Sequence, residues 1–308
     1  MPIPHPGRPP RELELQSILD RTVAKTLQLA LDPFWRSELP NLGRSVWQLF
    51  ADLQHAIRER QAFVLAVDDI QNCFPTTPIA SVVHWHQELI SQPELLWLTE
   101  RIIQGHGGPE RMTGLCQGSP YSPVALELLL HHCLDVPMTE AHSGLPLLLR
   151  YVDNLTFLCR SEREGQEAQQ WTRNCLSSYG YELKGEDDAP RDLRDPDFNQ
   201  VVLGMIPFWQ HNQLKFRIPD ESYADLETGL LNANLCPRPV TTARRVCQGW
   251  LEAVGMALTN AVTPTVIDRI LEIGRQAGYR EIDQRSLRET AKRSRRRWIA
   301  LCESRNRT

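Results

Sequence analysis

Membrane-spanning, secreted, disulfide-bonded and zinc-binding proteins carry sequence features that this chain of 308 residues lacks. Its apolar stretches fall short of the ~18 uncharged residues that suggest a membrane-spanning helix. Its N-terminus has no basic segment followed by an apolar core, so it does not have the pattern of a signal peptide. Eight cysteines occur without a CxxC pair, which favours reduced thiols and a cytoplasmic protein over a zinc site or a disulfide framework.

An excess of positive charge is also absent. The net charge of −4 argues mildly against nucleic-acid binding, because phosphate neutralisation requires lysine and arginine. The charges are segregated, however: residues 285–308 hold nine basic and two acidic side chains, whereas residues 182–197 hold seven acidic and three basic ones. Such a chain can be acidic overall and still present one basic surface. A solvated helix is an equally good interpretation of the basic C-terminal run.

The apolar pattern predicts a protein of mixed helices and strands without internal repeats. Short apolar runs indicate strands at 63–67, 147–152, 155–159, 201–206 and 214–218. Helical spacing is found at 11–41 with an interruption at Pro33, at 45–60, 78–104, in the later part of 113–135, at 164–179, and from 220 onward. Asp153-Asn154 is a turn-forming pair between two strands, so a β-hairpin with Asp153 at its tip is expected.

Two of these strands deliver an aspartate to their ends. Asp69 follows the run 63–67, and Asp153 lies at the hairpin tip. Carboxylates that end separate buried strands can meet at one point of a sheet, and Mg²⁺ usually takes one or two protein carboxylates together with substrate phosphates. A pair of such ions would activate a 3′-hydroxyl and stabilise a leaving pyrophosphate. Taken singly, each aspartate is better explained as a turn residue or a helix cap.

Three motifs in order surround these carboxylates: Asp69-Ile70-Gln71-Asn72-Cys73-Phe74, Gln117-Gly118-Ser119-Pro120-Tyr121-Ser122-Pro123, and Tyr151-Val152-Asp153-Asn154. With them the chain resembles reverse transcriptases, especially those of bacterial group II introns, retrons and phage-defence systems. The palm of that family carries Asp-x-x-x-x-Phe, Gln-Gly-x-Pro-x-Ser-Pro and Tyr-x-Asp-Asp. Segments 11–21, 43–45 and 202–204 extend the resemblance to roughly residues 8–210. A single match would be weak, whereas several in order are strong.

The resemblance implies an α+β fold of the right-hand polymerase type, with fingers, a palm built on an antiparallel sheet, and a helical thumb. We expect N-terminal fingers at 1–60 and a palm at 61–218 that contains a fingers insertion at about 75–112. A helical thumb with a basic C-terminus is expected at 219–308.

The resemblance also implies roles for single residues. Asp69 and Asp153 would be catalytic and would ligate two Mg²⁺ ions, or Mn²⁺ in their place, with the Ile70 carbonyl as a further ligand. Phe74 would lie under the sugar of the incoming nucleotide and favour deoxynucleotides. Further contacts would come from Gln117, Gly118, Arg11 and Arg8 to the nucleotide, and from Tyr151, Asn154, Leu203 and Gly204 to primer and template. Seen in isolation, Phe74 and Tyr151 are better explained by core packing.

Two departures from the family pattern bear on activity. The hairpin ends in Asp153-Asn154 instead of Asp-Asp, and an asparagine lacks the charge, so one metal ion would bind more weakly. Asp68 is not a simple substitute for the lost carboxylate, since neighbours on a strand point to opposite faces. The family usually has a lysine a few residues after Leu183, where this chain has Glu186-Asp187-Asp188. Lys184 would serve only if its loop were rearranged.

The last hundred residues carry no firm motif. Their basic side chains, Arg293 and Arg296 among them, would follow the template–primer backbone. Trp298 is better explained by packing of its helix than by base stacking. His84 and His86 have the spacing of a ligand pair but no nearby cysteine or acidic partner, so surface histidines are expected.

The sequence therefore predicts an RNA-directed DNA polymerase, a nucleotidyltransferase that stands alone and is bacterial by resemblance. Its partners would be a dedicated structured non-coding RNA as template, a DNA primer, dNTPs and a further protein subunit, in antiphage defence. Two alternatives stay open. One is a DNA polymerase that needs no template. The other is a catalytically weakened RNA- or protein-binding subunit, suggested by Asn154, although the retained Asp69, Asp153, Gln117 and Phe74 favour the enzyme.

Overall fold

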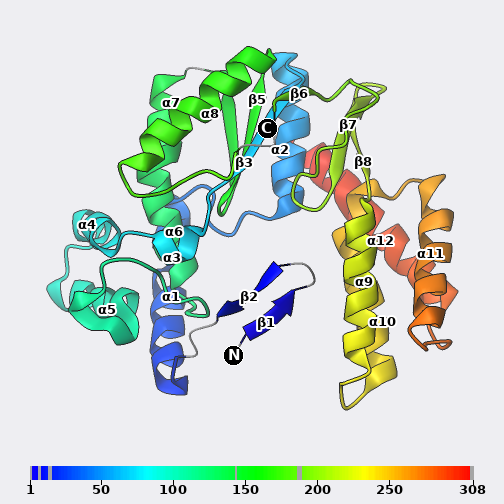
Figure 1. The fold of residues 1–308 in the computed structure, drawn as a ribbon, viewed down its shortest axis with the longest axis horizontal. Helices are drawn as coiled ribbons and strands as arrows, with labels where there is room; N and C mark the ends of the chain where they lie inside the picture. The colour runs from blue at the N-terminus through cyan, green and yellow to red at the C-terminus, as the bar shows by residue number, and fades with distance from the viewer. Residues whose placement is uncertain (1, 6–7, 13–15, 143, 186–188, 306–308) are drawn as a thin grey trace. The chain divides into compact units, whose positions relative to one another are not determined.

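The computed structural model of the chain describes residues 2–5, 8–12, 16–142, 144–185 and 189–305 (Figure 1). The chain folds as two compact units. The first unit comprises residues 1–45 and 65–190, and the second comprises residues 46–64 and 191–308. The division into fingers, palm and thumb drawn from the sequence uses other boundaries and stays a prediction.

The first unit begins with a hairpin of β1 (Pro2–His5) and β2 (Arg8–Glu12), followed by helix α1 (Ile18–Glu38). The helix starts at its cap, where the Ser17 hydroxyl accepts a hydrogen bond from the Asp20 N–H at 3.1 Å. The expected helix start near residue 11 is therefore wrong. Pro33 lies inside α1 and does not interrupt it, because the buried Trp35 and Leu27 hold the helix on both sides of the proline.

The first unit contains a sheet with the strand order β4-β5-β3, and helix α8 (Glu162–Ser177) lies beside it (Figure 1). Strand β3 (Val64–Asp69) is a buried apolar run that ends in two aspartates. Strands β4 (Leu147–Tyr151) and β5 (Asn154–Cys159) pair antiparallel, with Tyr151 opposite Asn154. The predicted hairpin with Asp153 at its tip is confirmed.

Helix α8 (Glu162–Ser177) covers this sheet in the first unit. Gly165 allows a close approach, since a Cβ at this position would lie 3.1 Å from the Cβ of Ala66 in β3. The Gln169 side chain donates a hydrogen bond to the Val67 carbonyl at 3.1 Å. The helix therefore rests directly on the strand that carries Asp69.

The other helical segments of the first unit are α3 (Cys73–Thr76), α4 (Ile79–Leu89), α5 (Pro93–Gln104), the 3-10 segment η1 (Gly105–Glu110), α6 (Ser122–Leu130), the π-helical segment η2 (His131–Asp135) and α7 (Val136–Ala141). Helix α6 is buried along almost its whole length and contains one charged residue, Glu127. The apolar helix expected after the Gly/Pro loop is thus confirmed, with a π-helical turn at its end.

The two histidines of α4 differ in their surroundings. His84 is exposed as expected, but His86 is fully buried, so the expectation of a surface position is wrong for His86. Its Nδ1 lies 2.8 Å from the Val82 carbonyl oxygen and its Nε2 lies 3.2 Å from the Tyr121 hydroxyl. Both ring nitrogens have partners, which is what allows a histidine to be buried.

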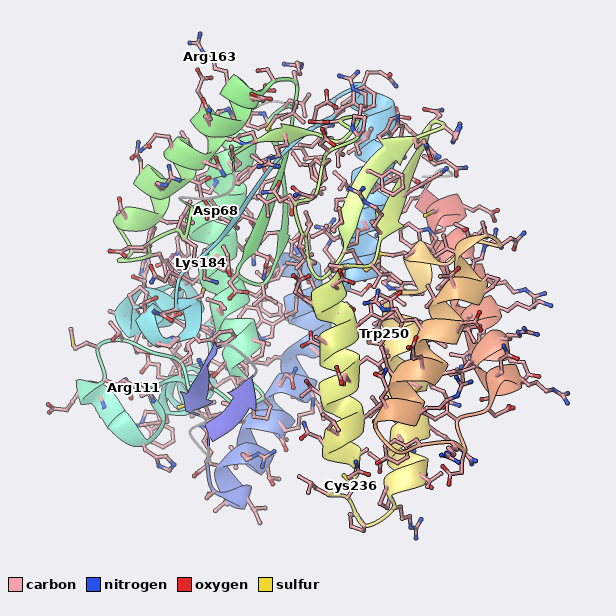
Figure 2. The ribbon with its side chains drawn as sticks, turned by 45° about the vertical axis from the view of Figure 1, so that its right-hand side comes forward. Asp68, Arg111, Arg163, Lys184, Cys236 and Trp250 are labelled. Atoms are coloured by element: carbon pink, nitrogen blue, oxygen red, sulfur yellow. The ribbon has the colours of Figure 1, made fainter. Side chains whose placement is uncertain are left out.

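The second unit contains α2 (Val46–Arg60), the short strand β6 (Arg191–Asp192), a hairpin of β7 (Ile206–Gln210) and β8 (Gln213–Arg217), and the helical segments α9 (Asp220–Ala233), α10 (Pro239–Ala253), η3 (Gly255–Ala257), α11 (Val262–Gln276) and α12 (Gln284–Arg305). Trp298 of α12 packs edge-to-face against Trp47 and Phe216, with ring centroids 6.1 and 5.6 Å apart. The packing role expected for Trp298 is confirmed. In the same unit Trp250 of α10 donates a hydrogen bond to the Ser222 carbonyl of α9 at 2.8 Å (Figure 2).

The prediction of a strand at 201–206 is wrong, because residues 202–205 form a turn. Leu203 and Gly204 have positive φ angles of 48° and 80°, and the main chains of Val202 and Met205 exchange hydrogen bonds of 2.7 and 3.0 Å across them. A two-residue turn of this kind favours glycine at its second position. The segment is therefore a tight turn, and the strand β7 begins only at Ile206.

All eight cysteines are free thiols in the structure. Within the described residues no helix is long and apolar enough to cross a membrane.

Candidate active site

The two predicted metal-binding aspartates come from adjacent strands of the first unit. Asp69 is the last residue of β3, and Asp153 lies in the turn between β4 and β5. The Ile70 N–H donates a hydrogen bond to the Asp153 carbonyl at 3.1 Å, so the hairpin tip is attached to the end of β3. Burial raises the pKa of the Cys73 thiol well above its ordinary value, and the charges of Asp153 and Asp69 raise it further. Both carboxylates therefore lie near one point.

The turn that carries Asp153 is strained. Only Val152 and Asp153 separate the paired residues Tyr151 and Asn154, and Val152 has a φ of 56°. A β-branched residue with a positive φ is a genuine outlier, and such strain persists only where the surroundings hold it. The Asn154 amide donates a hydrogen bond to Asp153 Oδ1 at 3.1 Å, which orients that carboxylate.

Asp69 has an oxygen that suits a metal ion. Its Oδ2 pairs with the Lys184 ammonium, whereas its buried Oδ1 has no hydrogen-bond partner among the described residues. A buried anionic oxygen without a partner is costly unless a cation or a donor completes it. Within the described ranges no group of three or more histidine, cysteine or acidic side chains is placed to hold a metal ion. The carboxylates of Asp69 and Asp153 fit Mg²⁺, which binds through one or two carboxylates plus substrate oxygens and water.

Lys184 pairs directly with Asp69, and its service in place of the family's lysine stays a prediction. The segment 182–184 runs along the end of β3: the Gln71 N–H donates to the Glu182 carbonyl at 2.8 Å, and the Lys184 N–H donates to the Asp69 carbonyl at 2.9 Å. The alternation of apolar and polar residues from Tyr181 to Lys184 is the sequence signal that points to this strand-like pairing.

Asp68 has a different role from Asp69. It is buried, and its Oδ1 accepts hydrogen bonds from the N–H groups of Asp69 and Gly185 at 2.9 and 3.0 Å. Arg173 of α8 lies 3.8 Å from its Oδ2 and donates to the Gly185 carbonyl at 3.2 Å. Figure 2 shows Asp68 next to Lys184. The Asp68 carboxylate thus anchors the segment that carries Lys184.

The motif residues expected to hold the nucleotide lie on two adjoining segments. The Leu115 N–H donates to the Phe74 carbonyl at 2.9 Å, and the Gly114 N–H donates to the Thr77 carbonyl at 2.8 Å. Gly114 has a φ of 92°, and a Cβ there would lie 3.1 Å from the Pro75 carbonyl oxygen. Main-chain hydrogen bonds therefore bring the loop of Gln117 and Gly118 next to the helical turn of Phe74. Phe74 and Gln117 are both half-buried.

Other predicted site residues lie elsewhere. Tyr151 is half-buried at the end of β4, next to the strained turn. Arg8 and Arg11 belong to β2, and their side chains are outside the described part of the structure. Leu203 and Gly204 form the tight turn of the second unit.

The two arginines predicted to contact template or primer are on α12. Arg293 donates a hydrogen bond to Glu252 of α10 at 2.7 Å, so its charge is already compensated within the second unit. Arg296 is exposed. Their roles, like those of the nucleotide-binding residues, stay predictions.

A comparison with protein families identifies the family to which this sequence belongs. The profile of the family described as reverse transcriptase (RNA-dependent DNA polymerase) matches residues 3–186, which is more than half of the chain. No curated protein matches the chain.

Solved telomerase structures are similar to this chain, and one of them has a TM-score that indicates a shared fold. The telomerase of Candida tropicalis in complex with a TWJ fragment of telomeric RNA matches with a TM-score of 0.50 and 12% identity, over 92% of this chain and 56% of that one. The apo telomerase of Candida tropicalis has a TM-score of 0.49 and 13% identity, over 89% of this chain and 59% of the other. The telomerase of Candida albicans with the same kind of RNA fragment has a TM-score of 0.47 and 12% identity, over 90% and 54%. The chain thus spans just over half the length of these telomerases, and the expected right-hand polymerase fold is confirmed.

Proposed function

Because this chain belongs to the reverse transcriptase family, we propose that it is an RNA-directed DNA polymerase whose catalytic carboxylates are Asp69 and Asp153. The observation that carries the proposal is the juxtaposition of these two aspartates, with a buried and unpartnered Oδ1 on Asp69 within the described residues. In phosphoryl transfer the main task of the protein is to position charged groups around the reacting phosphate.

Asp69 and Asp153 would hold two Mg²⁺ ions, or Mn²⁺ in their place, because carboxylate oxygens suit both metals. Such ions, when bound, promote attack by the primer 3′-hydroxyl and stabilise the leaving pyrophosphate. Phe74 would exclude a ribose 2′-hydroxyl, and Gln117 with the Gly118 main chain would bind the nucleotide. Arg8 and Arg11 would contact its triphosphate, and Tyr151 the primer end.

Asn154 makes the site less negative than an Asp-Asp hairpin would be. Its amide also occupies Asp153 Oδ1 with a hydrogen bond of 3.1 Å. Both effects weaken the attraction of the site for divalent ions, so we expect a higher Mg²⁺ requirement than in an enzyme with two aspartates. Asn154→Asp should lower the Mg²⁺ concentration that gives half-maximal primer extension.

The proposal also covers the template, the product and the cellular context. The template would be a dedicated structured RNA, the product DNA made from a DNA primer and dNTPs, and the context a bacterial antiphage system in the cytoplasm, with a protein subunit as a further partner. Although the net charge of the chain is −4, helix α12 holds eight basic and two acidic side chains, and this local excess of positive charge supports an RNA partner.

The test is primer extension by the purified protein with Mg²⁺ and all four dNTPs, on RNA and on DNA templates. Wild type is compared with Asp69→Asn, Asp153→Asn and, as matched control, Asp225→Asn, which alters an exposed aspartate of α9. Samples with co-purifying RNA retained and digested are run side by side. Extension that is abolished by both active-site changes, kept by the control and dependent on RNA is expected.

Two results would contradict the proposal. Extension without any nucleic-acid template would identify a template-independent polymerase. No extension under any condition, with RNA still bound, would favour a binding subunit; this is the alternative that Asn154 supports, and activity gained by Asn154→Asp would show that the missing carboxylate is the reason.

A further inference from the structure

The first unit contains a group of buried charges that the proposed chemistry does not use. Arg150 of β4 has a side chain with 0% exposure, and it lies between Glu127 of α6 and Asp135 of η2, whose side chains are 8% and 14% exposed. Three ionised groups in a protein interior cost free energy through lost hydration. Replacement of a buried ion pair or triad by apolar side chains of similar volume is often neutral or stabilising, so the stability of the fold does not require these charges.

The hydrogen bonds of Arg150 show what the group can do. Nη2 and Nη1 donate to the two carboxylate oxygens of Glu127 at 2.7 and 2.9 Å, and Nε and Nη2 donate to the two oxygens of Asp135 at 2.9 and 2.5 Å. These bonds use four of the five N–H groups of a guanidinium. The fifth donates to the Val152 carbonyl at 3.0 Å. That carbonyl belongs to the strained turn that carries Asp153.

The two carboxylates fix the guanidinium in one orientation. Burial opposes the charge of Arg150, but Asp135 and Glu127 outweigh it and raise the pKa of Arg150 above its ordinary value. Burial likewise opposes ionisation of Asp135, and Arg150 outweighs that effect and lowers the pKa of Asp135. Asp135 is held in turn by the Asn41 amide at 3.1 Å and ends a π-helical turn, a feature often found at functional sites.

The turn is thus held at two neighbouring carbonyls. On one side Arg150 binds the Val152 carbonyl, and on the other the Ile70 N–H binds the Asp153 carbonyl. The β-branched side chain of Val152 disfavours a positive φ. A fixed hydrogen-bond donor to the Val152 carbonyl opposes this tendency and holds the main chain in place. A displacement of about 1 Å at a reacting group can cost roughly 100-fold in rate.

We infer that Arg150 is a positioning residue: Glu127 and Asp135 orient its guanidinium so that the remaining N–H holds the Val152 carbonyl and thereby places the Asp153 carboxylate. This inference rests on the proposed function of Asp153, and it assigns to the buried charges a task that apolar residues cannot perform. Replacing the cluster by uncharged residues should preserve the fold and still damage the site.

The test separates stability from positioning. Arg150→Met alone leaves Glu127 and Asp135 buried without their partner and should lower the melting temperature. The triple variant Arg150→Met, Glu127→Leu, Asp135→Asn removes the uncompensated charges, and its melting temperature should return close to that of wild type. Its kcat for primer extension should remain roughly 10- to 100-fold below wild type, with KM for dNTP changed much less. Recovery of both melting temperature and kcat would overturn the inference.

A second variant and a second measurement keep the inference testable if the triple variant does not fold or if wild type does not extend primers. Arg150→Lys keeps the charge but offers three donors instead of five and lacks the planar fork, so it cannot make both bidentate pairs and still hold the Val152 carbonyl. Hydrogen exchange of the Ile70 amide, whose acceptor is the Asp153 carbonyl, should become at least about tenfold faster in this variant. The amides of the β4–β5 ladder should keep their protection. Unchanged exchange at Ile70 would overturn the inference whatever the enzyme activity is.

The matched control is Arg163→Lys, because Arg163 is an exposed arginine of α8 whose ion pair with Glu167 lies on the surface (Figure 2). It should leave kcat, melting temperature and Ile70 exchange unchanged. Inactive wild-type protein with normal Ile70 exchange would refute the proposed polymerase, whereas active wild type with unchanged exchange in Arg150→Lys would refute only the positioning role.

Discussion

Arg150 of the first unit and the basic side chains of α12 in the second unit lie in opposite surroundings. In the first unit Arg150 is fully buried, and its side chain makes five hydrogen bonds. In the second unit Arg288, Lys292 and Arg296 of α12 are exposed, while Leu287, Ala291 and Trp298 of the same helix are buried. A spacing of four residues places the three exposed cations along one face of the helix.

This difference separates two physical tasks. A buried guanidinium between two carboxylates is rigid and insensitive to salt, so it can place a backbone atom. Exposed cations on a helix are mobile and hydrated, and they suit a polyanion whose position need not be fixed to fractions of an ångström. We expect changes in the first unit to alter stability and geometry, and changes on α12 to alter only binding and its dependence on salt.

The largest effect is expected for Arg150→Met. It should lower the free energy of unfolding by about 3–5 kcal/mol, because it leaves two buried carboxylates without their counter-ion. Arg296→Met, at an exposed position, should change the same quantity by no more than about 0.5 kcal/mol. Urea unfolding followed by circular dichroism measures both. Equal stability of the two variants would remove the contrast between the units.

The next effect is a pH dependence in the first unit. Burial lowers the pKa of His86 to about 4, although its bond to the Val82 carbonyl favours the charged form. The ring has a pKa of about 6.5 in an unfolded chain. Between these values the unfolded state binds a proton that the folded state does not, so the free energy of unfolding should fall as the pH is lowered from about 6.5 to about 4.

Urea unfolding across this pH range measures the slope, and His86→Phe should flatten it. His211→Asn, in the exposed turn between β7 and β8, should leave the slope as in wild type. A slope that survives in His86→Phe would assign the dependence to other groups.

A smaller effect is expected from adding one methyl group at two glycines. A Cβ at Gly185 would lie 2.5 Å from Arg173 Nη2 and 2.7 Å from Asp68 Oδ2, so Gly185→Ala should destabilise the first unit by about 1–3 kcal/mol and displace Lys184. A Cβ at Gly249 of α10 has no atom within 4 Å, so Gly249→Ala should stabilise the second unit by about 0.5–1 kcal/mol. Thermal unfolding of the two variants should show shifts of opposite sign.

The smallest effect is expected for the exposed stripe of α12. Replacement of Arg288, Lys292 and Arg296 by glutamine should reduce the slope of log affinity for RNA against log salt concentration by about 0.7–0.9 for each phosphate that the variant no longer neutralises. Arg293→Gln should change it less, because Arg293 is paired with Glu252 at 2.7 Å. RNA binding titrated at several salt concentrations measures the slopes, and equal slopes in all variants would show that α12 does not bind the RNA.

Local features of the fold were predictable from the sequence. The apolar run that ends at Asp69, the hairpin with Asp153 at its tip and the helix from 46 to 60 follow from spacing and turn chemistry alone. Boundaries were less predictable where capping or a tight turn decides them, as at Ser17 and at Leu203-Gly204. Helical spacing does not mark its own first residue, because the cap lies outside the periodic segment.

Long-range partners were not predictable. Lys184 pairs with Asp69 across 115 residues, and His86 is buried against Tyr121, 35 residues away. Nothing in the local sequence of either residue indicates these partners. The same local sequence is compatible with a polar side chain that is solvated, paired or buried.

The sequence by itself determined the family and the order of its motifs, because strand ends, Gly/Pro loops and turn residues are read within a few positions of the chain. The tertiary structure alone decided which charges are compensated: Arg150 meets Asp135 and Glu127, 15 and 23 residues away, only when β4 lies against α6 and η2. The physical reason is that burial turns a solvated charge into one that must be paired, and burial is a property of the packed chain.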